Sequence, residues 1–463
     1  MTAWPWQHVA RSGRHSLATL RRSPLAEISG ALGDLGTLLP LMAALALQGS
    51  VSLSSTLVFS GLFNMATGLW FGIPLPVQPM KAIAAAAIAQ NASLRDTVAA
   101  GALVSGVVLV LAVTGLLRRL AEVVPVPVVK GIQVGAGLSL ALSAGGPSLL
   151  GGLGWLDQPS VLDNRLWALA AFAGLLLTQR MAPVGSSSSS SSSVRPAFLP
   201  FALVVFLLGF VFALLDHSHH AGHVLPHFAL WTPRLVLPHW LSSNAWAMAV
   251  AQLPLTTLNS VVAVSALADE LFSSSALPLL SLSSSSPFTP ATSVTAFGCS
   301  VGVMNLVGCW FGAMPVCHGA GGLAAQYRFG ARSGASVILL GAAKLLLGLF
   351  WGETLLDLLR AFPRSFLGVL VLAAGLELTA AGVTLNKGGD TSYSAQQKRE
   401  RWTVMLMTAA CLLAFKNDAV GFVAGLLCHG AYRLADALEA RRSRHNRLRR
   451  PGHHDESSTL LAS

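Results

Sequence analysis

The stretch "GLWFGIPLPVQPMKAIAAAAIA" (residues 68–89) interrupts an apolar run with prolines and then resumes as helix-forming sequence. Proline lacks the backbone N–H that a helix interior needs, and its ring clashes with the preceding turn. One apolar helix is therefore expected to end near residue 73. A second, short helix is expected to begin near Pro79 and to carry Lys81 in its first turn.

The composition requires lipid as the solvent. Of the 463 residues, 53% are hydrophobic and 11% are charged, and the mean hydropathy is +0.63. A soluble core cannot bury so much apolar surface, and apolar runs long enough to cross a bilayer recur along the chain. These features indicate an all-α polytopic membrane protein. The net charge of +11 gathers near the termini, as in "RRSRHNRLRR" (441–450), which favours cytoplasmic tails over nucleic-acid binding.

Fourteen membrane segments are predicted from the apolar runs and their glycine, proline and polar breaks. They lie at residues 31–47, 55–73, 79–91, 97–117, 127–144, 166–182, 197–215, 245–268, 292–313, 319–327, 334–351, 365–383, 402–415 and 417–434. The third and the tenth are too short to cross the hydrocarbon core alone.

The chain is predicted to consist of two halves between two tails. The parts are an N-terminal tail (1–28), a first repeat of seven segments (29–215), a histidine-rich loop (216–243), a second repeat (244–434) and a basic C-terminal tail (435–463). With both tails cytoplasmic, eleven Lys and Arg residues fall in loops on that side and six in loops on the other. This difference follows the positive-inside rule, so both termini are predicted to be cytoplasmic. The five histidines of "DHSHHAGHVLPH" lack the fixed spacing of a metal site, and no metal is predicted.

The proline break occurs twice. Residues 60–77 align with residues 300–316, and the alignment pairs "GLWFG" (68–72) with "GCWFG" (308–312). The copies are about 240 residues apart, and seven segments separate them, so the second copy enters the membrane upside down. Such an inverted repeat is typical of secondary transporters, whose paired interrupted helices mark a binding site near the midplane.

Each short helix would begin inside the membrane, where its free N–H groups and its partial positive charge of about half a unit need a partner. The N-termini that follow "PVQP" (76–79) and "PVCHG" (315–319) would converge on one cavity, which suits an oxyanion. Lys81 would add a full charge, and Gln78 and His318 would add directional contacts. For Lys81, snorkelling or an internal ion pair is the structural alternative.

Polar residues in the first and eighth segments are expected to line the same cavity. They are Asp34 and Thr37 in the first segment, and Gln252, Thr256, Thr257, Asn259 and Ser260 in the eighth. For Asp34 three roles stay open, namely proton or cation coupling, a salt bridge to Lys81 that substrate breaks, or a helix N-cap. The Thr and Asn side chains could equally join neighbouring helices. Lys344 and Glu377 are predicted to form a structural ion pair or to lie at helix ends.

Four motifs carry a resemblance to a known family. They are "EISGALGDLGTLLPL" (27–41), "GIPLPVQPMKAIAA" (72–85), "QLPLTTLNS" (252–260) and "PVCHGAGGLAAQYRFGARSG" (315–334). Together they resemble the molybdate transporter family related to the SulP sulfate transporters, over about residues 27–434. The resemblance implies a core and a gate of seven plus seven segments, shared with uracil permeases, and an elevator-like transport of molybdate, a tetrahedral dianion. It also implies a homodimer, no cofactor, and no C-terminal STAS domain.

Carried onto this chain, the resemblance implies a set of site residues. The substrate would lie against Gln78, Pro79, Met80 and Lys81 on one side and His318, Gly319, Ala320 and Gly321 on the other. Thr37, Gln252, Thr256 and Asn259 would line the pocket, and Asp34 is the coupling candidate.

Other functions require other residues. A sulfate or other oxyanion transporter of the same fold would use the same charges, and only cavity size and hydrogen-bond placement separate the two dianions. A nucleobase carrier is expected to have carboxylates in the eighth and tenth segments, but the tenth has none, and Asp269 and Glu270 lie at the far end of the eighth. No nucleophile, histidine and acid converge as in an enzyme, and a non-transporting scaffold has no need of a buried charge and two broken helices. The tail "ESSTLL" (456–461) fits a dileucine sorting signal, so a vacuolar or other endomembrane and the plasma membrane both stay open.

Overall fold

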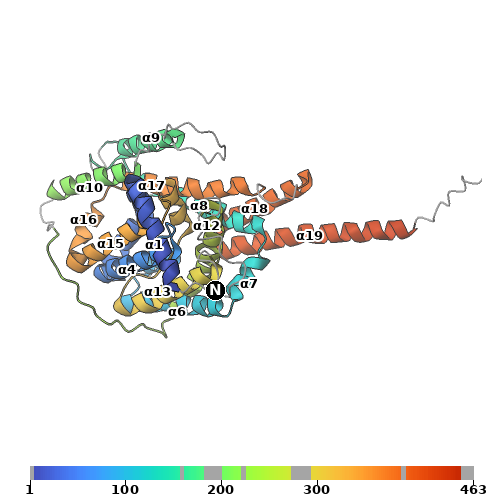
Figure 1. Cartoon of the computed structure of the whole chain (residues 1–463), viewed down its shortest axis with the longest axis horizontal. Coiled ribbons are helices and arrows are strands. Elements are labelled where there is room, and N and C mark those ends of the chain that lie inside the picture. Colours follow the sequence, from blue (N-terminus) through green and yellow to red (C-terminus); the bar gives the residue numbers. More distant parts are fainter. Residues whose placement is uncertain are drawn as a thin grey trace, which may run out of the picture.

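The computed structural model describes residues 5–156, 161–181, 201–219, 226–272, 293–386 and 393–449, and these are mostly helical (Figure 1). The first half contains α1 (Pro5–Arg22), α2 (Pro24–Leu32), α3 (Leu35–Leu47), α4 (Leu53–Phe71), β1 (Val77–Pro79), α5 (Lys81–Gln90), α6 (Leu94–Val113), α7 (Leu116–Val123), α8 (Val126–Ala144), η1 (Leu150–Gly152), α9 (Arg165–Met181) and α10 (Phe201–His219). The second half contains α11 (Ser243–Pro254), η2 (Leu255–Ala263), α12 (Val264–Phe272), α13 (Val294–Gly308), η3 (Cys309–Phe311), β2 (Val316–His318), α14 (Ala320–Arg328), α15 (Ala335–Phe350), η4 (Gly352–Leu355), α16 (Leu356–Arg360), α17 (Arg364–Ala380), η5 (Ala381–Thr384), α18 (Ala395–Phe415) and α19 (Asp418–Arg449). The segment η2 is a π-helix, and the other η segments are 3-10 helices.

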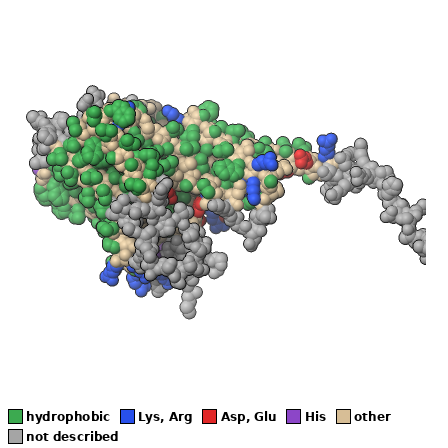
Figure 2. All heavy atoms as spheres, turned by 90° about the horizontal axis from the view of Figure 1, so that it is seen from above, with side chains coloured by type: hydrophobic (Ala, Val, Ile, Leu, Met, Phe, Trp, Pro, Cys, Tyr) green, Lys and Arg blue, Asp and Glu red, His purple; other side chains and the backbone are tan. Residues whose placement is uncertain are grey.

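Every predicted membrane segment coincides with a helix or a series of helices. The first is α2 and α3, which meet at an angle of 41°, and the eighth is α11, η2 and α12 in succession. By length and composition, five described helices, or up to seven if bent pairs count as one span, could cross a membrane. The all-α membrane class is therefore confirmed, and fourteen crossings agree with the order of the helices. Figure 2 shows hydrophobic side chains over much of the molecular surface, with Lys and Arg at its margins.

The helices pack in two groups. In the first group α4 lies along α15 and α6 along α13, with α5 and α11 beside them; in the second, α8 lies along α17 and α18, with α9 and α19 beside them. We call the first group, together with the short helix α14 and with η2 and α12, which continue α11, the core, and we call the second group the gate. Glycines allow the close crossing of α4 and α15, because a Cβ on Gly61 would lie 2.7 Å from the carbonyl oxygen of Gly341. Small residues let helix backbones approach closely where lipid is the solvent.

The two proline breaks form matching structures. Gly72 and Gly312 end α4 and η3 in the left-handed conformation, with φ of 69° and 73°, a conformation that costs glycine little. The chain then enters β1 and β2, which pair antiparallel with Val77 opposite His318. This antiparallel pairing agrees with the inverted repeat, because the two short helices α5 and α14 leave one small sheet in opposite directions.

An asparagine supports each strand in the same way. The Asn64 side-chain oxygen accepts a hydrogen bond from the Val77 amide at 2.8 Å, and the Asn305 oxygen accepts one from the Val316 amide at 2.6 Å. The sequence alignment places Asn64 opposite Met304, so Asn305 lies one residue later in its half than Asn64 does in the first half. The 3-10 turn η3 accounts for the shift, because three 3-10 residues rise about as far as four α-helical residues, roughly 6 Å.

Two further features lie at the edges of the core. The N-terminal region predicted as a tail contains α1, which contacts the end of α4 through a 2.8 Å contact between His8 Nε2 and the Trp70 carbonyl oxygen. Residues 226–240 run without helix along the core, and their amides bond to carbonyl groups at the end of α15 and at Trp310. The polyserine stretches (185–193 and 281–286), the middle of the histidine-rich loop (220–225) and the tail at 456–461 lie outside the described residues.

Candidate functional site

The candidate site lies where α5 and α14 begin. The Met80 amide donates a 2.9 Å hydrogen bond to the Pro315 carbonyl oxygen, which joins the two breaks just before α5. Gln78, Met80 and His318 are all buried. The structure thus brings together the two motifs that lie about 240 residues apart in the sequence.

Gln252 caps the N-terminus of α5. Its side-chain oxygen accepts hydrogen bonds from the amides of Ala82 at 2.8 Å and Ile83 at 3.3 Å, and its Nε2 donates to Thr256 at 2.9 Å. Gln252 lies three residues before the first residue of the π-helix η2, which follows Pro254, and π-helical turns are frequent at functional sites. The predicted pocket residue Gln252 therefore contacts the α5 N-terminus, and Thr256 holds the Gln252 side chain. The direct cap on α5 was not predicted from the sequence.

Gln78 covers the N-terminus of α14. A Cβ built on Gly319 would lie 1.7 Å from Gln78 Oε1, and one on Gly322 would lie 2.5 Å from Gln78 Nε2. Gly319 has no side chain with which to cap α14, and within the described chain Gln78 Oε1 has no hydrogen-bond partner. A side-chain oxygen thus lies beside a helix N-terminus, where backbone amides favour an oxyanion.

Asp34 and Thr37 hold Gln78 in this place. Gln78 Nε2 donates to Asp34 Oδ1 and, at 3.1 Å, to Thr37 Oγ1, and Thr37 Oγ1 donates to Asp34 Oδ1 at 3.0 Å. Asp34 stands at the N-cap position of α3, but its side chain makes no capping hydrogen bond. Of the roles left open for Asp34, the side-chain N-cap is therefore not observed.

Lys81 begins α5 and is half-buried. In the described ranges, its ammonium group has no hydrogen bond and no ion pair, so the salt bridge to Asp34, one of the roles left open, is not observed; the acids whose charges act on it are Asp34 and Asp418. Asp418 is the first residue of α19, in the gate. Cys317 accepts a 3.2 Å hydrogen bond from Ser260 in η2. Sequence reasoning missed Asp418 and Cys317 as neighbours of Lys81, although an acid at the start of the fourteenth segment was a visible signal.

The His318 side chain points into the protein instead of toward α14. Its Nδ1 contacts the Pro76 carbonyl oxygen at 3.3 Å and its Nε2 contacts Ser300 Oγ at 3.0 Å. The ring also packs edge-on against Phe71 and Phe297. Both nitrogens are thus occupied, and we retain only the backbone of His318 in the candidate site.

The first turn of α14 packs against the gate. A Cβ on Gly321 would lie 2.6 Å from Leu140 of α8 and 3.8 Å from Leu378 of α17, and Ala320 is fully buried. Asn259 in η2 is buried, and its side-chain oxygen has no hydrogen-bond partner in the ranges described. Pro79 contributes the last residue of β1. The site therefore lies in the core, directly beside the gate.

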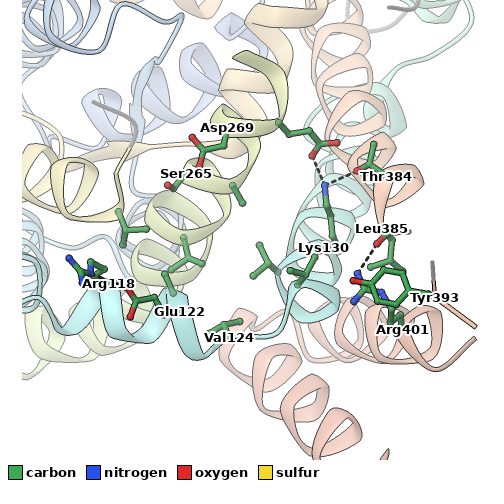
Figure 3. Close-up of a pocket in the computed structure, with 17 residues that line it drawn as sticks. Arg118, Glu122, Val124, Lys130, Ser265, Asp269, Thr384, Leu385, Tyr393 and Arg401 are labelled. Carbon is green, nitrogen blue, oxygen red and sulfur yellow. Dashed lines mark hydrogen bonds and ion pairs between the residues drawn. The ribbon is translucent and has the colours of Figure 1, made fainter. Parts of the chain in front are cut away.

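A cavity of about 670 Å³ opens between core and gate, and its lining includes Val262 of η2, three residues after Asn259. Figure 3 shows its charged lining, in which Lys130 of α8 bonds to Thr384 at 2.8 Å and forms an ion pair with Glu270 of α12. We call this cavity the vestibule. Its walls come from both helix groups, so a movement of the core against the gate would change its shape.

Lys344 and Glu377 do not form the predicted ion pair. Glu377 pairs with Arg328 of α14 at 3.8 Å. Lys344 is instead buried in α15, and its Nζ has no hydrogen-bond partner in the described ranges. The ion pair was predicted wrongly because the rotation of each helix about its own axis, which the sequence does not give, decides which charged side chains face each other.

Comparisons with known proteins show the family of this chain. Residues 26–140 and 244–378 match the family described as "Molybdate transporter of MFS superfamily". Molybdate transporter 2 of Arabidopsis thaliana is 38% identical over 442 residues, which cover 88% of this chain and 87% of that protein. Molybdate transporter 1 of the same plant is 39% identical, over 90% of each chain. Molybdate transporter 1 of Chlamydomonas reinhardtii is 33% identical, over 91% of this chain and 93% of its own.

Solved structures show the same fold at low identity. SLC26A9 matches with a TM-score of 0.52 and 15% identity over 90% of this chain, which spans only 65% of that longer chain. The murine solute carrier 26 member A9 anion transporter in its inward-facing state matches with a TM-score of 0.53 and 14% identity, over 90% of this chain and 68% of that one. The resemblance carried by the four motifs is confirmed, and the named relatives are transporters, not enzymes. This multi-pass membrane protein belongs to the molybdate transporter family.

Proposed function

We propose that this protein is a secondary transporter that carries molybdate across a membrane and binds it between the N-termini of α5 and α14. The observation that carries the proposal is the meeting of these two N-termini at the paired strands β1 and β2, beside Lys81. Each helix N-terminus contributes a partial charge of about +0.5, and Lys81 adds one unit. The sum of about two unit charges matches a dianion.

The two glutamines would exchange places with the substrate oxygens. Gln252 and Gln78 each place a side-chain oxygen at one N-terminus, where the oxygens of a tetrahedral oxyanion would bind. A neutral amide is readily replaced there by an anion, because hydrogen bonds to a charged acceptor are stronger than bonds to a neutral one. The backbone amides of α14 would then hold the anion beside Gly319 and Gly321.

Transport would follow from a movement of the core against the gate. The bound anion would move with α5 and α14, past Leu140 and Leu378 of the gate, and would leave through the vestibule. Movement of one helix bundle against the other is the usual basis of alternating access. The excess of Lys and Arg in the loops on the vestibule side supports a cytoplasmic opening and cytoplasmic termini.

Uptake by purified protein in proteoliposomes tests the proposal. Labelled molybdate should accumulate inside the vesicles, and a large excess of sulfate should fail to suppress it; protein-free vesicles are the control. Equal competition by sulfate would instead assign the chain to general oxyanion transport. Absence of uptake for both anions would contradict transport altogether. A tagged protein imaged in its own cells would decide between an endomembrane and the plasma membrane.

A further inference from the structure

Helix α1 lies across the end of α4. The Ser12 hydroxyl donates to the Gly68 carbonyl oxygen at 3.5 Å, and His8 Nε2 contacts the Trp70 carbonyl oxygen at 2.8 Å. Gly68 and Trp70 belong to the last turn of α4, which ends at Phe71. Figure 1 shows α1, in dark blue, crossing α4 and α15 instead of running along them, and α1 contacts both. Because a spanning helix ends near the membrane surface, α1 lies at about the level of the lipid headgroups.

The predicted topology decides which surface this is. The helix α4 is the second membrane segment, so it ends on the side of the membrane where the N-terminus lies. With the termini cytoplasmic, as proposed above, α1 lies at the cytoplasmic surface. The cytoplasmic leaflet contains anionic phospholipids, and its negative surface potential attracts Lys and Arg side chains near the membrane.

The charges of α1 face away from the core. Ser12 and Ser16 are buried on its inner side. Four arginines on the remaining surface are exposed, namely Arg11, Arg14, Arg21 and Arg22. The helix contains no Asp or Glu, and within the described ranges none of the four arginines forms an ion pair. This side of α1 therefore carries an unbalanced positive charge that suits an anionic partner.

An exposed leucine among the arginines favours a membrane as that partner over an acidic protein. Leu17 is 47% exposed, and it lies three residues after Arg14 and four before Arg21, so the three side chains adjoin on the helix surface. At the end of α4, Leu69 and Trp70 are also partly exposed, by 37% and 45%. Tryptophan is enriched where hydrocarbon meets water. Arginines beside apolar and aromatic side chains are typical of a helix that lies in the membrane interface.

We propose that α1 is an interfacial helix that binds the headgroups of anionic phospholipids through Arg11, Arg14, Arg21 and Arg22. Guanidinium groups form paired hydrogen bonds with phosphate oxygens, and Leu17 would enter the acyl-chain boundary beside them. Because α1 packs on α4 and α15, these lipids would be held by the core. The inference goes beyond the proposed function, and it rests on the proposed orientation only for the choice of leaflet.

The test measures binding of short-chain phosphatidylserine and phosphatidylcholine to the purified full chain in an uncharged detergent. The wild type should bind phosphatidylserine at least about tenfold more tightly, because each arginine near an anionic headgroup contributes about fivefold. Replacing all four arginines with glutamine should abolish this preference, and replacing all four with lysine should retain it. Arg234→Gln is the matched control, because Arg234 is an exposed arginine outside α1, and it should leave the preference unchanged.

Three results would overturn the inference. Equal binding of both lipids by the wild type would leave the arginines to an acidic protein, and an unchanged preference in the glutamine variant would place the lipid elsewhere. Competition by soluble glycerophosphoserine at the concentration at which the lipid binds would assign the site to a free phosphate ester.

A smaller variant keeps the test decisive if the fourfold glutamine variant fails to fold. Arg14→Gln/Arg21→Gln should weaken phosphatidylserine binding by at least about tenfold and leave phosphatidylcholine binding unchanged, and wild-type binding of phosphatidylserine by this variant would overturn the inference. None of these measurements involves molybdate, so the uptake assay tests the proposed function separately.

Discussion

Replacing Gly319 with alanine should disrupt the anion site without straining the backbone. Gly319 has φ −112° and ψ 126°, an extended conformation that any residue adopts. The effect of the added methyl group is therefore steric. It would lie 1.7 Å from Gln78 Oε1, so the Gln78 side chain must move by more than 1 Å.

The cost follows from the hydrogen bonds that this movement breaks. Gln78 is held by Asp34 and by Thr37, the latter at 3.1 Å. A hydrogen bond to a charged group contributes about 1.5–3 kcal/mol. That loss destabilises the empty protein. Because the added methyl group and the displaced Gln78 side chain would also occupy the place of a substrate oxygen beside the α14 N-terminus, molybdate binding should weaken by at least about tenfold, which corresponds to about 1.4 kcal/mol.

The assay is molybdate binding to purified protein, with thermal unfolding as a check on folding. Gly106→Ala is a matched control, because Gly106 lies in α6 and a Cβ there meets nothing within 4 Å. The control should bind like the wild type. Binding by Gly319→Ala within threefold of the wild type would refute the account of how Gln78 and α14 meet.

Three further predictions concern the charges and the interface between core and gate. Lys81→Ala should weaken molybdate binding by more than about tenfold, because a unit charge beside a dianion is lost; normal transport by this variant would remove Lys81 from the site. Gly321→Ala places a Cβ 2.6 Å from Leu140, and such overpacking costs about 1–3 kcal/mol; uptake should slow, and Leu140→Ala in the same chain should restore it, whereas a lack of restoration would argue against this contact. Lys130→Gln and Glu270→Gln each remove the ion pair between α8 and α12. Distances measured between spin labels on the core and on the gate should therefore shift by the same amount in both variants. Unequal shifts would show that the ion pair does not join the two groups.

The broken helices could be predicted from the sequence because their signals are local. The prolines that follow "WFG" disfavour continuation of the helix, and the repeated "WFG" in both halves revealed the second break. An odd number of intervening segments then implied opposite directions, and the antiparallel pairing of Val77 with His318 agrees. Gln78, Gly319 and Gly321 were placed at one site for these reasons.

The side-chain contacts could not be predicted because they depend on how each helix is rotated about its axis. The cap that Gln252 provides for α5 joins residues that are 170 positions apart in the sequence. No local sequence pattern links positions so far apart. The orientation of His318 toward Ser300 depends on a pocket formed by Phe71 and Phe297. The same limit explains why Glu377 pairs with Arg328 and not with Lys344, which was one of the two alternatives for these residues.

The most direct test of the central claim is to locate bound molybdate. Molybdenum scatters X-rays anomalously, so crystals grown with molybdate would show its position without reference to the protein density. The account predicts one strong peak between the N-termini of α5 and α14, within contact distance of Lys81 and of the Gly319–Gly321 backbone. A peak confined to the vestibule beside Lys130, with none between the two short helices, would contradict it.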